Sequence, residues 1–209
     1  MYKNKNVLRQ LMTVLFIVIA LPLAKAQVHV GDILYEDNSE SESVGKAIGV
    51  VFYVDGTKQH GWAVALNDEG ELSWGPNWVS TSAPDRTSLA GALADVNGYA
   101  NTQKILSHEN PADIYYPAFE ALDFSNGWYL PAVGQLKKLY RNLDKVNAGL
   151  SAAGGTVIST EEGNEFWSST EYSSSSSWFM DWKGKMHCKD VTYNGTKDAR
   201  RIVRGVRSF

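Results

Sequence analysis

The spacing of apolar residues changes twice along this chain, and no other feature constrains the fold as strongly. Residues 31–36, 47–54 and 62–66 are short runs rich in Val, Ile, Phe, Tyr and Trp, which favour β-strands. Between residues 85 and 150 the apolar residues recur at helical spacing. After Glu161 the period is two again. The order of strands, helices and strands predicts an α+β domain with a mainly antiparallel sheet and two or three helices.

The helical segment divides into three candidate helices. The first begins near Asp85, which is a suitable N-cap residue, and its apolar positions are Leu89, Leu93 and Val96. The second begins at residues 111–113, although Pro117 lies inside it. The third has the clearest pattern and extends to Gly154. Its apolar face consists of Val133, Leu136, Leu139, Tyr140, Leu143, Val146 and Leu150.

The last third of the chain is expected to form strands. Residues 178–182 alternate in the manner of a strand, and Lys183-Gly184 is typical of a hairpin turn that leads into a second strand over 185–190. Residues 203–207 predict a final strand. The five-serine run 173–177 lies between aromatic residues, so we expect a loop inside the domain and not a linker.

Residues 1–26 are typical of a secretory signal peptide. They contain a basic start, an apolar run over 11–23 and the small-residue site Ala24-Lys25-Ala26. The run is shorter than the roughly 20 apolar residues that a bilayer needs. We therefore expect cleavage before Gln27, export to the periplasm, cell surface or medium, and no membrane span. Residues 27–209 are expected to form a single domain.

Charge is distributed unevenly along the chain. The whole sequence has 20 basic and 23 acidic residues, but residues 183–209, here called the basic tail, contain eight basic and two acidic residues. Such a tail attracts an acidic partner or neutralises the acidic body of its own protein. Apolar residues interrupt the basic ones in a strand-like pattern, which favours internal neutralisation. Export disfavours nucleic acid as a partner.

Cofactors and metals are not expected. Cys188 has no second cysteine to pair with, so an intramolecular disulfide is excluded. The four histidines are scattered singly, whereas a zinc site needs several ligands at suitable spacing. No EF-hand loop and no Glu-Pro-Asn or Trp-Asn-Asp triplet of calcium-dependent sugar binders occurs. The sequence therefore predicts binding without a metal.

Catalytic motifs are equally sparse. Neither a Gly-x-Ser-x-Gly elbow nor a paired Cys and His pattern is present. Glycoside hydrolysis needs two carboxyl groups at a suitable separation. Four glutamates near the end of the chain are candidates for such a pair: Glu161, Glu162, Glu165 and Glu171. An enzyme that acts on envelope polysaccharide is therefore kept as an alternative.

Seven tryptophans and ten tyrosines are many for this length. Trp128, Trp167 and Trp178 lie in apolar blocks, so we expect them in the core. Trp74 and Trp78 lie among turn residues and are candidates for exposed rings that contact a ligand. The serine run and the following hairpin combine rings with short polar groups and charges, a mixture typical of binding surfaces. The candidate ligand-binding residues are Trp74, Trp78, Tyr172, Ser174, Ser175, Ser176, Asp181, Trp182, Lys183, Lys185, His187 and Lys189.

Three blocks, in order, resemble the Lcl carboxy-terminal domain family, which has a C-type-lectin-like fold. Residues 128–136 resemble the Leu-Pro-x-x-x-Glu-Leu start of a helix, with Gln135 where an acid is often found. Residues 167–172 match the block Trp-Ser-Ser-Thr-Glu-Tyr, and residues 203–207 resemble a terminal Val-Arg-x-Val-Arg strand. A more distant likeness exists to the formylglycine-generating enzyme fold. Those enzymes use a cysteine pair that binds copper, which a lone Cys188 does not provide.

The resemblance implies a C-type-lectin-like module, of a kind that binds more often than it catalyses. The leading hypothesis is an exported, adhesin-like module that recognises a surface glycan or a surface protein. The alternatives are the enzyme named above and a structural subunit of a surface assembly, which would associate through an exposed strand edge.

Overall fold

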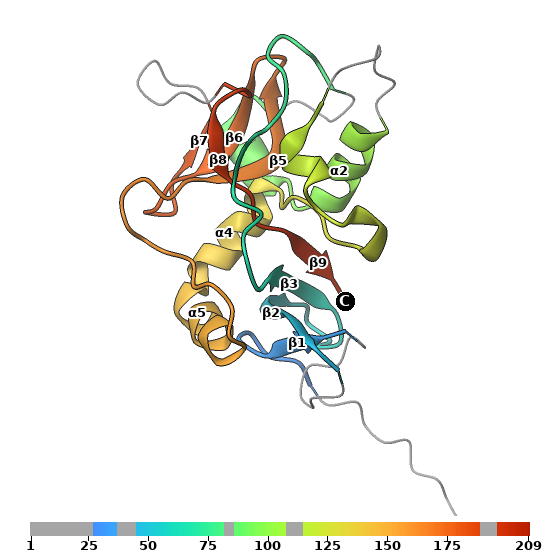
Figure 1. The fold of residues 1–209 in the computed structure, drawn as a ribbon, viewed down its shortest axis with the longest axis vertical. Helices are drawn as coiled ribbons and strands as arrows, with labels where there is room; N and C mark the ends of the chain where they lie inside the picture. The colour runs from blue at the N-terminus through green and yellow to red at the C-terminus, as the bar shows by residue number, and fades with distance from the viewer. Residues whose placement is uncertain (1–26, 37–44, 82–85, 108–114, 189–195) are drawn as a thin grey trace, which may run out of the picture.

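Figure 1 shows the computed structural model of the protein, which describes residues 27–36, 45–81, 86–107, 115–188 and 196–209. Two β-sheets occupy the two ends of the molecule, and helices lie beside and between them (Figure 1). The expected signal peptide lies outside the described residues. A single domain over 27–209 stays a prediction.

The first sheet contains four antiparallel strands in the order β1-β2-β3-β9. Its strands are β1 (Ile33–Tyr35), β2 (Ala47–Val54), β3 (Gly61–Ala65) and β9 (Val206–Ser208). The bounds of β2 are those predicted, since its apolar run supplies both the core and cross-strand neighbours. The third strand of the chain, β3, therefore pairs directly with the last strand, β9, and brings the two ends of the described chain into one sheet.

The second sheet has the order β4-β8-β5-β6-β7. Its strands are β4 (Glu71–Ser73), β8 (Arg200–Ile202), β5 (Phe166–Ser173), β6 (Ser176–Met180) and β7 (Met186–His187). All its pairs are antiparallel except β5 with β8. The final strand predicted over 203–207 is wrong in its bounds: residues 203–205 carry the chain from β8 in this sheet to β9 in the first one.

Five α-helices are present among the described residues, whereas two or three were expected. They are α1 (Leu89–Ala94), α2 (Gly98–Leu106), α3 (Pro117–Glu120), α4 (Val133–Arg141) and α5 (Leu143–Ala152), and a 3₁₀ turn, η1, spans Phe124–Asn126. Ser88 caps α1 in place of the predicted Asp85, which lies outside the described residues. Pro117 begins α3, at a position where its missing N–H costs no hydrogen bond.

The third predicted helix divides into α4 and α5 at Asn142. The Asn142 side-chain amide donates to the carbonyl of Lys138 at 3.2 Å and to that of Phe52 on β2 at 3.1 Å. A side chain that bonds to backbone carbonyls in this way competes with regular helical bonding. The division lets both helices lie against β2, which each of them contacts.

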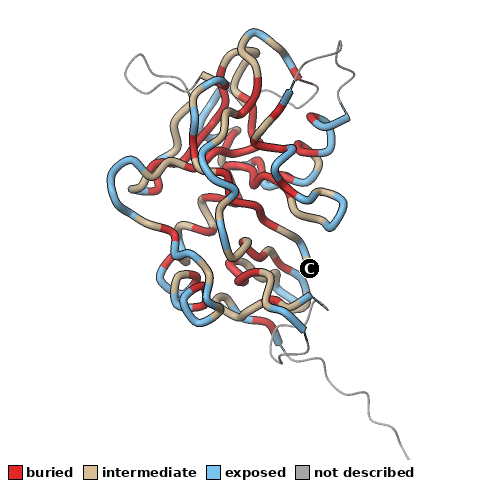
Figure 2. The backbone as a smooth tube through the Cα atoms, in the orientation of Figure 1, coloured by how far each residue is buried: buried red, intermediate tan, exposed pale blue. Residues whose placement is uncertain are grey.

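Two large apolar clusters hold these layers together, and Figure 2 shows buried backbone through the middle of the molecule. The first cluster joins the apolar faces of α4 and α5 to β2, β3 and β9. The second lies under α2 and α3 and contains Trp74, Trp167 and Phe179. The α+β expectation is confirmed in its general form, a mixed α/β protein with antiparallel sheets.

Candidate functional site

The polar residues of β5 are satisfied inside the protein. Four consecutive ones are buried: Ser168, Ser169, Thr170 and Glu171. The Ser169 amide donates to the Pro131 carbonyl at 2.8 Å, and the Val133 amide donates to the Thr170 hydroxyl at 3.0 Å. These bonds attach the beginning of α4 to the strand, so the first two blocks of the family resemblance contact each other for a structural reason.

The five-serine run is not the loop that we predicted. Residue 173 ends β5, Ser174-Ser175 form a two-residue turn, and Ser176 begins β6. Ser176 is buried and pairs with Thr196. Only Ser174 and Ser175 of the three predicted ligand-binding serines are therefore partly exposed. The strand pattern, in which successive side chains point to opposite faces, continues up to Ser173 and resumes at Ser176. These two residues pair across the hairpin.

At the opposite end of β6, Asp181 organises a turn and does not face a ligand. It is buried, and its carboxylate accepts hydrogen bonds from the amides of Lys183 at 2.8 Å and Lys185 at 2.9 Å. Its other oxygen lies 3.0 Å from Nε2 of His187, whose ring stacks on Phe179. Asp181 and His187 are thus held by internal contacts, which corrects the prediction for Asp181 as an exposed ligand contact.

Residues 182–185, here called the lysine turn, remain accessible. Lys183 and Lys185 are exposed, Trp182 is half-buried, and the Lys183 ammonium lies 5.6 Å from the centre of the Trp182 ring. On the inner side the Lys137 ammonium donates to the Gly184 carbonyl at 3.0 Å. The candidate Lys189 lies outside the described residues.

Hydrogen bonds within the lysine turn lower the pKa of Asp181 and make the stability of the fold depend on pH. Burial alone would raise the pKa of Asp181, but the hydrogen bonds from His187 and from the two lysine amides outweigh it and lower the pKa below the ordinary value of 3.8. A carboxyl group with a lower pKa in the folded state stabilises the fold above its unfolded pKa. This contribution is fully present above pH 3.8 and is lost as the pH falls through the lowered folded value.

Replacing Asp181 by alanine is expected to lower the free energy of unfolding by about 1–3 kcal/mol, because two turn amides lose their acceptor. Amide hydrogen exchange at Lys183 and Lys185 should accelerate. Asp181→Asn, which keeps one acceptor oxygen, should recover part of the loss. Lys183→Ala is the matched control and should change stability by less than about 0.5 kcal/mol. Unchanged exchange in Asp181→Ala would contradict this role.

The predicted binding surface is divided in two by β6. From Ser175 to Asp181 the chain advances six residues, which in an extended strand corresponds to roughly 20 Å. Tyr172 and the turn Ser174-Ser175, here called the serine turn, therefore lie near one end of β6. The lysine turn lies near the other end. The sequence places these groups close together along the chain, but the strand between them separates them in space.

Trp74 and Trp78 differ completely, although both lie among turn residues. Trp74 is fully buried, contacts Phe119 edge to face, and donates from its ring nitrogen to the Ser168 carbonyl at 2.7 Å. Its prediction as a ligand contact is therefore wrong. Trp78 is 82% exposed and has a φ of 65°, a left-handed conformation that is unusual for a bulky residue.

Residues 75–81, here called the Trp78 loop, arch over the end of the second sheet that carries the serine turn (Figure 1). Lys197 joins the two. Its backbone amide donates to the Ser175 carbonyl at 3.1 Å, and its carbonyl accepts from the amides of Trp74 and Gly75. The exposed ring and the serine turn are thus parts of the same end of the molecule.

A buried ion pair fixes the Trp78 loop. Lys197 and Glu171 are both fully buried and form a salt bridge. The Lys197 ammonium also donates to the Val79 carbonyl at 2.7 Å and lies 4.6 Å from the centre of the Trp74 ring. The Glu171 carboxylate accepts from the Thr81 hydroxyl at 2.5 Å. Lys197 therefore holds residue 79 and Glu171 holds residue 81. Both of these residues follow Trp78 in the chain.

Three residues of the basic tail neutralise acidic residues of the same protein, in agreement with the internal role predicted for the tail. Besides the pair of Lys197 with Glu171, Arg201 contacts Glu165 at 2.9 Å, and Arg204 contacts Asp68 at 2.9 Å. The sequence pattern indicated the internal role of the tail but not the individual partners, which are up to 136 residues away. Lys197 and Thr81, which position the Trp78 loop, were not among the predicted site residues.

The four candidate catalytic glutamates do not gather around one space. Glu171 is buried in its ion pair, Glu165 is bound to Arg201, and Glu161 and Glu162 lie exposed on a turn. Within the described ranges no group of three or more His, Cys, Asp or Glu side chains is arranged to hold a metal ion. The helices in that part of the chain include none whose length and apolarity would suit a membrane crossing.

The tryptophans expected in the core also require one correction. Trp167 and Trp178 are buried as predicted, but Trp128 is only partly buried and lines a surface hollow. Its neighbours in sequence are apolar, so the pattern gave no sign of its exposure. The hollow forms from segments that are distant in the chain.

No protein-family model matches the sequence, and no curated protein sequence matches it. Among solved structures, the fold is similar to the crystal structure of a fimbrial protein from Bacteroides ovatus ATCC 8483, with a TM-score of 0.65 and 18% sequence identity. The alignment covers 87% of this chain and 49% of that one, so the chain spans about half the length of that protein. At this identity the likeness shows the fold alone.

Proposed function

We propose that the protein is an exported, non-catalytic binding module with a C-type-lectin-like fold that recognises a surface glycan or a surface protein. Its contact surface consists of the Trp78 loop together with Tyr172, Ser174 and Ser175. The order of the three sequence blocks supports the fold assignment, and the internal hydrogen bonds of β5 give the second block a role in that fold.

The exposed ring of Trp78 on a fixed loop is the observation that carries this proposal. A large apolar ring in water favours burial against a partner, and tryptophan is enriched among the residues that dominate binding energy. The left-handed backbone at residue 78 has a conformational cost on the order of 1 kcal/mol. The buried ion pair holds the loop in place despite that cost. A ring ordered in advance loses less conformational entropy when a ligand binds.

A location outside the cytoplasm is supported by two independent features. The first 26 residues have the pattern of a signal peptide. The protein of similar fold from Bacteroides ovatus is described as fimbrial, which fits a protein of the cell surface. We infer the same setting for this chain.

Replacing Trp78 by alanine is expected to weaken ligand binding by roughly tenfold or more, as for the truncation of a dominant interface residue. The measurement is a screen of the purified protein on arrayed glycans and on surface proteins, followed by titration of whatever binds. Trp78→Gly removes the same ring and also relieves the left-handed strain. Both variants should lose binding while the melting temperature stays within a few degrees of that of the parent protein.

Two further variants locate the surface. Tyr99→Ala removes another exposed ring, located on α2, and should leave affinity unchanged. Trp182→Ala and Lys185→Ala test the lysine turn at the other end of β6. Loss of binding in these two variants with none in Trp78→Ala would move the site to that turn. A wild-type protein that binds nothing on either array would refute the proposed function.

A structural subunit of a surface assembly is less well supported by the strands. Association through a strand edge needs a long unpaired edge. The outermost described strands are β1, β4 and β9 with three residues each and β7 with two. Such short edges offer few hydrogen bonds to a second chain, so we favour the binding module.

A further inference from the structure

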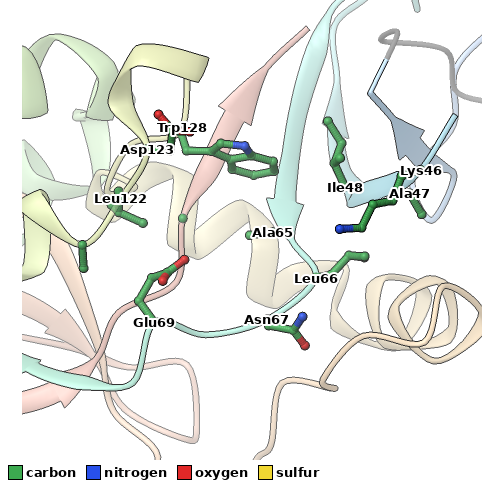
Figure 3. A pocket seen from close by; sticks show the side chains of 12 residues that line it. Lys46, Ala47, Ile48, Ala65, Leu66, Asn67, Glu69, Leu122, Asp123 and Trp128 are labelled. Atoms are coloured by element: carbon green, nitrogen blue, oxygen red, sulfur yellow. The ribbon is translucent and has the colours of Figure 1, made fainter.

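A concave surface lies beside the first sheet and includes no residue of the Trp78 loop. It is a hollow of about 450 Å³, here called the Trp128 hollow, and falls within the volume range of small-molecule sites. Figure 3 shows Trp128 and Glu69 on one side of it and Lys46 and Ile48 on the other, with Ala65 of β3 between them.

Small residues of β2 and β3, together with Gly205 directly before β9, form the support beneath the Trp128 ring. Gly49 on β2 pairs with Ala65 on β3, and the Ala65 amide donates to the Gly205 carbonyl at 2.9 Å. A methyl group on Gly49 would lie 3.2 Å from Cη2 of Trp128, and one on Gly205 would lie 3.5 Å from its Cε3. A methyl group on Gly49 would therefore crowd the indole, whereas one on Gly205 would be in ordinary van der Waals contact with it. The ring packs against this backbone and remains partly exposed.

Polar groups of different kinds line the hollow. They are the Lys46 ammonium, the Asn67 amide and the carboxylates of Glu69 and Asp123. Carboxylates accept hydrogen bonds, an ammonium group donates them, and an amide does both. A ligand with many hydroxyl groups, each of which donates and accepts, can satisfy all of these groups at once.

A buried arginine, Arg204, holds the segment that carries Asn67 and Glu69 on one side of the hollow. The Arg204 guanidinium donates to the carbonyls of Ala65 at 2.9 Å and Leu66 at 2.7 Å and to the Asp68 carboxylate at 2.9 Å. These contacts fix the backbone on both sides of Asn67 and adjacent to Glu69. On the other side of the hollow, Asp123 caps η1 and accepts hydrogen bonds from Ser125 and Asn126.

We propose that the Trp128 hollow is a saccharide-binding site that takes an uncharged pyranose unit, with the sugar ring stacked on Trp128 and its hydroxyl groups bound by Glu69, Asn67 and Lys46. This site goes beyond the surface assigned to Trp78 and does not depend on it. The two carboxylates exceed the single ammonium, so a uronate or another anionic sugar meets net negative charge and is disfavoured. A purely apolar ligand would displace water from Lys46 and Glu69 without replacing the hydrogen bonds that the water made.

The test is a titration of the intact protein with neutral and anionic saccharides, followed by NMR. The probes are methyl glycosides and short oligosaccharides of glucose, galactose, mannose and N-acetylglucosamine, with glucuronate as the anionic probe. Trp128→Phe identifies the indole N–H resonance of residue 128, because that signal disappears from the spectrum. At least one neutral probe should shift this resonance in a saturable manner, and glucuronate should bind more weakly.

Variants then separate recognition from folding. Trp128→Ala and Glu69→Gln should each weaken that saccharide by about tenfold or more. Trp62→Ala is the matched control, because it removes another half-buried indole, located on β3, that stacks on Tyr53 outside the hollow. It should leave the affinity unchanged. Thermal melts of all three variants confirm that the fold is retained.

Failure of this site is distinguishable from failure of the proposed function. If no neutral saccharide shifts the Trp128 signal, or if affinity survives both Trp128→Ala and Glu69→Gln, the saccharide site is refuted. Neither result affects binding that depends on Trp78. Cleavage of a bound oligosaccharide, detected by chromatography, would support the saccharide site but would overturn the non-catalytic assignment.

Discussion

Replacing Lys197 by methionine is expected to lower the free energy of unfolding by about 3–5 kcal/mol. The substitution leaves the Glu171 carboxylate buried without its positive partner and removes the donor to the Val79 carbonyl. Both side chains of the pair are fully buried, so water does not take the place of the missing charge. Urea denaturation of the purified protein, fitted to a two-state transition, measures the change.

A double variant gives this prediction its sharpest control. Lys197→Met combined with Glu171→Met removes both charges and should recover at least half of the lost stability, since buried ion pairs are often replaceable by apolar residues. Lys145→Met removes an exposed lysine and should change stability by less than about 0.5 kcal/mol. If the double variant is less stable than Lys197→Met, the unpaired buried charge is not the cause of the loss.

A substitution of Arg204 by methionine should destabilise the protein to a similar extent, about 3–5 kcal/mol. Arg204 is buried, and its guanidinium donates to the carbonyls of Ala65, Leu66 and Thr156 as well as to the Asp68 carboxylate. Methionine matches much of the volume but donates no hydrogen bond, so the Ala65 and Thr156 carbonyls and the Asp68 carboxylate lose the arginine donor, while the Leu66 carbonyl keeps the Thr156 amide. Amide hydrogen exchange should accelerate most in residues 65–69 and 156, where the contacts are lost.

Two arginine variants control for charge and geometry. Arg200→Met removes an exposed arginine from β8 and should have an effect below about 1 kcal/mol. Arg204→Lys keeps the charge but provides a single donor atom in place of the planar group, so it should recover little of the stability. Full recovery with lysine would show that charge, and not the shape of the guanidinium, is what matters at this position.

The two substitutions also affect different parts of the surface. Lys197→Met should loosen the Trp78 loop and weaken binding that depends on Trp78, because the loop loses the donor to residue 79. Arg204→Met should instead loosen the wall of the Trp128 hollow. If Lys197→Met weakens binding in the Trp128 hollow, or Arg204→Met weakens binding that depends on Trp78, the two surfaces are parts of one site.

Several elements were predicted well from local sequence patterns, because residues close together in the chain determine whether a strand or helix forms. The run over 47–54 is rich in β-branched and aromatic residues and forms β2 with the predicted bounds. Helix α2 was not predicted as a separate helix, because Gly98 only weakened the helical pattern that begins near Asp85. Asn97 caps the helix, and Gly98 allows a close approach in which a methyl group would lie 2.5 Å from the Leu130 carbonyl oxygen. A glycine with a role in tertiary contact looks the same in the sequence as one that only weakens a helix.

The candidate site was predicted less well than the fold. Trp74 and Trp78 occur in the same turn-rich context, yet one is buried under Phe119 and the other is exposed. The serine turn and the lysine turn are neighbours in the sequence but occupy opposite ends of β6. Trp128 resembled a core residue, although it lines a hollow. The differences among the tryptophans depend on segments more than 40 residues apart in the chain, whereas the two turns are separated by the length of the extended strand between them.

The sequence by itself determined the α+β class, the main strand runs and the neutralising role of the basic tail, because hydrophobic period and net charge act along the chain. The tertiary structure alone decided which tryptophan reaches water, which acid receives Lys197, and which strands enclose the Trp128 hollow. These outcomes depend on partners that meet only after the two sheets and α4 have packed together. The burial of an ion pair is a property of that assembled interior, and no single segment carries it.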